Sequence, residues 1–261
     1  GHHPDVYMSP TKEPFHFILN GERPSYNGPG DREVFAQLAV PSRKKYEALF
    51  DDVTDEKAIG EATTQYLYVD HAAENIHAAV PDAKILIFLR HPVERAYSSY
   101  MHMLRDGRET YEDFEEALRY EPERIAANWE PLWHYTSASY YAESVERYYD
   151  LFGKEQVGVF LHDELKLDAP KLLYHVCQFL GVDDSFRPDT STRYNVSGVP
   201  KNKMMHAVQT ALLNPDNPVK AIVKPLLPKR LRHQALHGVV DKIRTVNFED
   251  RKLDTELRQR V

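Results

Sequence analysis

The stretch "AKILIFLRHPVERAYSSY", residues 83–100, decides the fold class of this chain. Its first half is an apolar run rich in branched residues, which is typical of a strand buried on both faces of a parallel sheet. After His91 the pattern becomes helical, because Pro92 suits a first helical turn and Gly107 suits the end of the helix. A buried strand that leads directly into a helix predicts an α/β fold.

A second strand and helix pair occurs later in the chain. The strand pattern is "EQVGVFLHDEL", residues 155–165, and the helix pattern is "DAPKLLYHVCQFLGV", residues 168–182. Asp168 is suited to cap the start of this helix, Pro170 falls in its first turn and Gly181 follows its end. The repetition predicts a parallel sheet flanked by helices.

Other elements give weaker patterns. We expect strands at 5–8 and 58–61, a helix over 68–80, helical structure throughout 112–152, and loops at 20–31 and 183–200. The C-terminal third contains "NPDNPVKAIVKPLLPKRLRHQ", which is basic and interrupted by prolines. That pattern predicts short helices that cover the domain rather than further sheet.

Composition limits the class of protein. The 261 residues, 42% hydrophobic and 28% charged, are enough for one sizeable core, so we expect a single domain over 1–261. The net charge of −7 argues against a nucleic-acid partner and requires local positive groups for any anionic ligand. Cys177 is the only cysteine, so no disulfide forms within the chain. No apolar run is long enough to span a bilayer, and we expect a soluble cytoplasmic protein.

The turn after the first strand carries a candidate anion site. Arg90 ends the strand, and Ser98 follows about two helical turns after Pro92. A guanidinium at the carboxyl edge of a parallel sheet, followed by a helix start and a hydroxyl, provides donors for a phosphate. Either residue alone would more simply be structural, but the joint pattern favours a binding site.

This pattern, Arg90-x-Pro92-x-x-Arg95-x-x-Ser98-x-Tyr100, resembles the 3′-phosphate signature of sulfotransferases that use 3′-phosphoadenosine 5′-phosphosulfate (PAPS). Four other segments resemble the bacterial and heparan-sulfate-like branch of that family: "HPDVYMSPTKEPFHF" (3–17), "GEATTQYL" (60–67), "YAESVERYYDLFG" (141–153) and "RYNVSGVPKN" (193–202). The resemblance covers residues 2–210, and 211–261 would be a helical C-terminal cover. It implies the P-loop-kinase-like sulfotransferase fold.

The resemblance also implies roles for residues. PAPS would be the donor and the desulfated nucleotide PAP the product, with no metal. Arg90 and Ser98 would bind the 3′-phosphate, and Arg95 would be structural. Glu13 would be the general base for the acceptor hydroxyl, with His16 or Lys12 orienting it or stabilising charge.

Several of these assignments stay open. His16 is an alternative base, because the unperturbed pKa of a histidine suits neutral pH better than that of a glutamate. Tyr141 would either flank the adenine or ribose or belong to the core. Lys201 and Lys203 would either reach the 3′-phosphate or be solvated.

The sequence departs from the family pattern at four places. Phe15 separates the "KEP" motif from His16, His91 stands where Asp or Asn is common, and Thr64 replaces a proline of the "GE" segment. The Gly- and Thr-rich loop that holds the 5′-phosphosulfate in the family is not in this sequence. We therefore expect a first strand and phosphate loop to belong immediately before His2.

A hydroxyl, or an amine, of a small molecule, carbohydrate or lipid would fit as the acceptor. One alternative function is a kinase-like phosphotransferase, which would require a Walker lysine and magnesium-binding acids. Another is a noncatalytic nucleotide-binding module, which would bind the donor without turnover. The histidines show no metal-ligand spacing, so no metal site is expected.

Overall fold

The computed structural model describes residues 3–19, 21, 25–188, 199–200, 248–249, 253 and 255–260. The chain divides into two compact units, one formed by residues 1–96 and 118–193 and the other by 97–117 and 194–261. The single domain expected over 1–261 stays a prediction. So does the helical cover over 211–261, of which α14 (Thr255–Arg260) is described.

Parallel strands form the framework of the first unit. β1 (Val6–Met8) pairs with β2 (Ala58–Gly60), and β3 (Ile85–Leu89) pairs with β4 (Val157–Leu161). All four strands fall where the sequence predicts them, and the α/β class with parallel strands is confirmed. The predicted sheet differs in one respect, because in the described part of the chain these strands form two separate two-stranded sheets.

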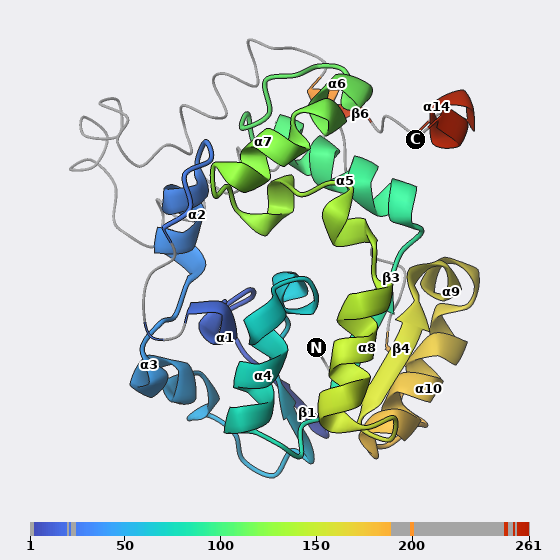
Figure 1. Cartoon of the computed structure of the whole chain (residues 1–261). Coiled ribbons are helices and arrows are strands. Elements are labelled where there is room, and N and C mark those ends of the chain that lie inside the picture. Colours follow the sequence, from blue (N-terminus) through green and yellow to red (C-terminus); the bar gives the residue numbers. More distant parts are fainter. Residues whose placement is uncertain are drawn as a thin grey trace, which may run out of the picture. The chain divides into compact units, whose positions relative to one another are not determined.

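Helices cover these strands. The first unit contains α1 (His16–Leu19), α2 (Asp31–Leu38), α3 (Arg43–Glu47), α4 (Asp70–Ala79), α7 (Glu121–Ala126), α8 (Ala142–Phe152), α9 (His162–Leu167) and α10 (Ala169–Leu180). α8 lies on one side of β4 and α10 on the other (Figure 1). Ala73 of α4, Tyr148 of α8, and Ile87 and Val157 of the strands are buried in one apolar core.

Both predicted caps of α10 are present. Asp168 Oδ1 accepts a hydrogen bond from the backbone N–H of Lys171 at 3.0 Å, and Gly181 ends the helix with φ 79°. The preceding strand is shorter than expected, because β4 ends at Leu161 and α9 begins. Glu164 Oε2 accepts the Leu161 backbone N–H at 3.2 Å, which caps α9.

The prediction of helix throughout 112–152 is wrong for residues 127–141. This segment contains only two short 3₁₀ turns, at Pro131–Trp133 and Ser137–Ser139. The buried carboxylate of Asp31 accepts hydrogen bonds from the Glu130 N–H and from Trp133 Nε1, both at 2.9 Å. Because the distant Asp31 carboxylate satisfies these two N–H donors, the segment is stabilised without intrahelical hydrogen bonds. Its backbone therefore departs from the helix that the local periodicity predicts.

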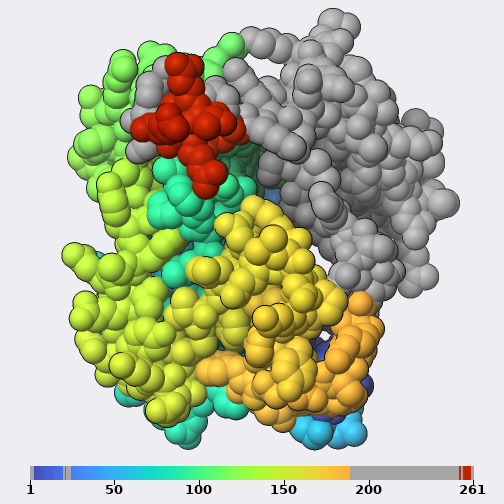
Figure 2. All heavy atoms as spheres, turned by 90° about the vertical axis from the view of Figure 1, so that its right-hand side faces the viewer, coloured from blue at the N-terminus to red at the C-terminus, as the bar shows by residue number. Residues whose placement is uncertain are grey.

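The N-terminal segment before β1 is fixed within the first unit. His3 Nε2 lies 2.7 Å from the Asp183 carbonyl oxygen, and the His3 ring packs on Phe186 at 4.8 Å. Asp5 forms an ion pair with Lys57 at 2.8 Å. Figure 2 shows the start of the chain in dark blue beside the orange segment that contains Asp183. The amino end of β1 is therefore fixed by these contacts.

The second unit contains most of α5 (Pro92–Arg105), which begins in the first unit, and the start of α6 (Phe114–Arg119). The helix α5 ends as predicted, with Gly107 at φ 69°. Tyr100 and Phe114 are buried and their rings lie 5.1 Å apart. β5 (Val199–Pro200) and β6 (Phe248–Glu249) form an antiparallel pair. The expectation of a loop through residue 200 and of no further sheet in the C-terminal third is therefore wrong at these strands.

In the described residues, none of the helices combines the length and the apolar character needed to cross a bilayer.

Candidate active site

The segment after β1 has an unusual backbone. Glu13 and Phe15 both adopt φ of 54°, a left-handed conformation that non-glycine residues rarely take. Phe15 holds this turn in place, since its side chain is buried in the core and its ring lies 4.5 Å from that of Phe35. Such a conformation persists only where the surroundings fix it, and it is found most often at functional sites. The Lys12–His16 segment is thus the first candidate region.

Glu13 is held at the carboxyl ends of β1 and β2. Its Oε2 atom accepts a hydrogen bond from the Thr64 backbone N–H at 2.9 Å, and its own N–H donates to the Ala62 carbonyl at 3.2 Å. Burial raises the pKa of the Glu13 carboxyl, and the nearby negative charge of Glu61 acts in the same direction. The Thr64 hydrogen bonds and the exposed Lys12 cation oppose this shift without cancelling it. A carboxylate with a raised pKa is suited to act as a general base.

His16 makes different contacts. Its Nδ1 lies 2.8 Å from the Val40 carbonyl oxygen, which can only accept a hydrogen bond, so Nδ1 carries the proton. The imidazole also stacks on the Tyr46 ring at 4.1 Å with an interplanar angle of 8°. The structure therefore places the two candidate bases in separate sets of contacts.

Arg90 lies at the carboxyl end of β3, as the sequence predicts. Its side chain is about one-third exposed and its Nε contacts Glu94 at 3.4 Å, a long ion pair. The Tyr141 hydroxyl donates a hydrogen bond to the Arg90 carbonyl at 3.1 Å, so Tyr141 supports this turn. His162 follows β4, and the register of Leu89 with Leu161 brings it beside Arg90.

His162 adds a polar group to this edge. Burial lowers the pKa of its imidazole, and the Arg90 and Lys166 cations lower it further, so the ring is kept neutral. Its Nδ1 atom is buried and has no hydrogen-bond partner in the described part of the chain. Lys166 contacts Asp163 at 2.8 Å and Glu94 at 3.5 Å. Arg90 and Lys166 could hold an anionic nucleotide in exchange for their contacts with Glu94 and Asp163, and the buried His162 Nδ1 is a further polar group there.

The remaining predicted residues are Ser98, Lys201 and Lys203. Ser98 lies on α5, in the second unit, and is half-buried. Lys201 and Lys203 lie outside the described residues. Glu13 and Arg90 share no hydrogen bond or ion pair among the residues that are described, so they belong to two distinct clusters at the carboxyl ends of the two parallel pairs.

Arg95 has a structural role in its surroundings. Its guanidinium is buried and donates to the carbonyls of His134 at 2.9 Å and Tyr135 at 2.6 Å and to the Ser139 hydroxyl at 2.7 Å. Burial lowers its pKa. These contacts fix the irregular segment that precedes α8.

We expect Arg95→Met to lower the free energy of unfolding by about 2–4 kcal/mol, because the His134 and Tyr135 carbonyls and the Ser139 hydroxyl lose their charged donor in a buried site. Urea denaturation followed by circular dichroism measures this change. Arg43→Met is the matched control, since Arg43 forms an exposed pair with Glu47 within α3 and should have little effect. Equal stability of the two variants would contradict the structural role of Arg95.

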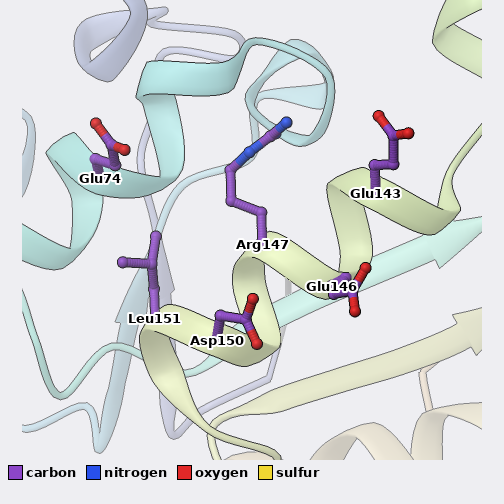
Figure 3. A pocket seen from close by; sticks show the side chains of 6 residues that line it. All are labelled: Glu74, Glu143, Glu146, Arg147, Asp150 and Leu151. Carbon is purple, nitrogen blue, oxygen red and sulfur yellow. The ribbon is translucent and has the colours of Figure 1, made fainter.

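A surface groove on α4 and α8 is a poor candidate for the donor site. Figure 3 shows Glu74, Glu143, Glu146, Arg147, Asp150 and Leu151 lining it. Arg147 is engaged with Asp70 at 2.5 Å, and the other charged groups of the lining are carboxylates. An anionic nucleotide would be repelled there.

Sequence reasoning missed two residues that the structure places in the clusters. Glu61 comes directly after β2, and His162 comes directly after β4. Ligands of parallel α/β folds bind at the carboxyl ends of strands, so the polar residue that follows the apolar part of each strand pattern is the signal that identifies them.

Comparison with known proteins finds similarity to sulfotransferases. A family model described as "Sulfotransferase family" matches residues 31–186. A crystal structure of a sulfotransferase from Alicyclobacillus acidocaldarius is 39% identical, covers 85% of this chain and 87% of its own, and has a TM-score of 0.69. The sulfotransferase domain from the curacin biosynthetic pathway is 13% identical over 71% of this chain and 76% of its own, with a TM-score of 0.38. No curated protein sequence matches.

Proposed function

Because this chain belongs to the sulfotransferase family, we propose that it transfers the sulfuryl group of PAPS to a hydroxyl group of an acceptor and releases PAP. The acceptor would be a small molecule, a carbohydrate or a lipid. The protein would act in the cytoplasm.

The observation that carries this proposal is the half-buried Glu13 carboxylate at the carboxyl ends of β1 and β2. Burial raises its pKa, and the Thr64 N–H fixes one of its oxygens at 2.9 Å. In sulfuryl transfer the acceptor oxygen forms a bond to sulfur while the bond from sulfur to the leaving phosphate oxygen breaks. Glu13 would take the hydroxyl proton in this step, and Lys12 beside it would stabilise negative charge on the transferred group.

Glu13 is a better candidate for the base than His16. The Nδ1 atom of His16 is bound to the Val40 carbonyl and its ring is stacked on Tyr46, contacts that suit a residue fixing the wall of the site. We propose that His16 orients the Lys12–His16 segment and that Glu13 accepts the proton.

Binding of the sulfuryl donor PAPS would involve the cluster around Arg90 at the carboxyl ends of β3 and β4. PAPS supplies the sulfuryl group and carries a 3′-phosphate, which Arg90 would bind through its exposed guanidinium edge, with Ser98 as a neutral donor. Tyr141, which holds the Arg90 carbonyl, would border the nucleotide. Lys201 and Lys203 are further proposed contacts to the 3′-phosphate.

This proposal is tested by calorimetric titration with PAP and with ADP, combined with a turnover assay. We expect PAP to bind with micromolar or better affinity and ADP at least tenfold more weakly, because ADP lacks the 3′-phosphate. PAPS should be converted to PAP in the presence of an extract that contains hydroxyl compounds, without added magnesium. Turnover of ATP that requires magnesium would favour the phosphotransferase, and PAP binding without PAPS turnover would favour a noncatalytic module.

A further inference from the structure

Glu61 is surrounded by hydroxyl groups at the carboxyl end of β2. Thr63 Oγ1 donates to its Oε2 at 2.8 Å, and the Tyr46 hydroxyl donates to its Oε1 at 3.4 Å. The Tyr66 hydroxyl also forms a hydrogen bond with this carboxylate, and the Tyr66 ring is buried in the core. Three hydroxyl donors from separate positions thus fix the half-buried Glu61 carboxylate. The sequence pattern alone did not identify Glu61 as a site residue.

The segment that carries Glu61 is joined to the segment that carries Glu13. The Ser9 N–H donates to the Gly60 carbonyl at 2.8 Å, and the Glu13 N–H donates to the Ala62 carbonyl at 3.2 Å. In return, the Thr64 N–H donates to Glu13 Oε2 at 2.9 Å. These bonds extend the β1–β2 pairing beyond the strands and hold Glu13 at its φ of 54°. Displacement of residues 60–64 would therefore displace the Glu13 carboxylate.

The charges around Glu13 include Glu61 as a second carboxylate. Burial raises the Glu13 pKa most, Thr64 and Lys12 lower it, and the charge of Glu61 raises it. Burial also raises the pKa of Glu61, while the three hydroxyls and the His16 ring favour its charged form. A second carboxylate in a partly desolvated site disfavours the ionised state of the first, so the charge of Glu61 makes Glu13 a stronger base.

We propose that Glu61 is a positioning residue for the reaction: held by Tyr46, Thr63 and Tyr66, it fixes residues 60–64 against Glu13 and keeps a negative charge beside the Glu13 carboxylate. This inference rests on the proposed function, since it assigns Glu61 to the base of that reaction. Glu61 does not itself receive the proton of the acceptor. Its charge strengthens Glu13 as a proton acceptor, and its hydrogen bonds set the direction of the Glu13 side chain.

The test is Glu61→Gln, which removes the charge and keeps the size of the side chain. The surrounding hydroxyls can either donate or accept, so they accommodate the amide. Carboxyl-carbon NMR titration of Glu13, assigned with Glu13→Gln, should give a midpoint at lower pH in Glu61→Gln than in the wild type. Turnover is expected to fall about three- to tenfold at neutral pH, because a weaker base accelerates proton removal less.

The pH profile of turnover gives a second readout. The active form of Glu13 is the carboxylate, so activity is lost as the pH falls through the Glu13 pKa. A raised pKa places this loss at higher pH than for an ordinary glutamate. Removing the Glu61 charge should move the acidic limb of the profile to lower pH. A purely structural role would reduce activity without moving this limb.

Two variants serve as controls. Glu61→Asp keeps the charge and should keep the acidic limb at the wild-type pH, even if turnover falls through longer hydrogen bonds. Glu74→Gln makes the same chemical change on the exposed side of α4 and should alter neither the Glu13 midpoint nor turnover. Thermal unfolding of each variant checks that the fold is retained.

An unchanged Glu13 midpoint in Glu61→Gln would overturn the inference, as would an equal shift in Glu61→Asp. If the midpoint moves but the wild type transfers no sulfuryl group, the proposed function is wrong and the coupling between the two carboxylates stands. If the wild type is active and the midpoint does not move, the inference is wrong and the proposed function stands.

Discussion

Glu13→Gln is expected to lower turnover by about a hundredfold or more while PAP affinity stays within about twofold, because it removes a positioned general base but not the groups that bind the nucleotide. The amide oxygen of glutamine can still accept the Thr64 N–H, so the local structure is retained. Steady-state kinetics and calorimetry on the same preparations measure the two quantities.

His16→Gln is the matched variant for this prediction. It removes the competing base at the other end of the Lys12–His16 segment, and its side chain can still donate to the Val40 carbonyl. We expect its loss of turnover to be much smaller than that of Glu13→Gln. Full activity in Glu13→Gln together with loss of activity in the histidine variant would make His16 the base.

Arg90→Ala should weaken PAP binding by about 2–4 kcal/mol, or roughly 30- to 800-fold, because a phosphate loses a charged and partly desolvated partner. The effect should be largest for ligands that carry a 3′-phosphate and small for ADP. Calorimetric titrations of wild type and variant with both nucleotides measure this difference.

Glu94→Gln is the control for the arginine variant. It removes the Arg90 ion pair at 3.4 Å and keeps the guanidinium, so PAP affinity should be retained or increased. Equal PAP affinity in Arg90→Ala and the wild type would remove Arg90 from the donor site.

Much of the fold could be predicted from local sequence signals. The apolar run before Arg90 gives β3, and Asp168 and Gly181 mark the ends of α10. These elements depend on periodicity and on caps that lie within a few residues of one another. The irregular segment at 127–141 could not be predicted this way, because Trp133 is bound by Asp31, which is 102 residues away in the sequence.

The site was predictable in part for a similar reason. Glu13 and Arg90 were predicted as site residues because they belong to sequence patterns, and the structure places both at the carboxyl ends of parallel strands. Glu61 was part of a quoted pattern, but its proximity to Glu13 depends on the pairing of β1 with β2. The left-handed conformation of Glu13 also depends on that pairing, since glutamate has no intrinsic preference for it.

The most direct measurement for the central claim is the transfer of radioactive sulfur from ³⁵S-labelled PAPS to compounds of an extract, compared between the wild type and Glu13→Gln. We predict labelled acceptor and an equal amount of PAP with the wild type, and a loss of label of about a hundredfold or more with the variant at the same nucleotide occupancy. Equal labelling by the two proteins would contradict the role of Glu13, and PAP binding with no labelled acceptor in the wild type would contradict the proposed function.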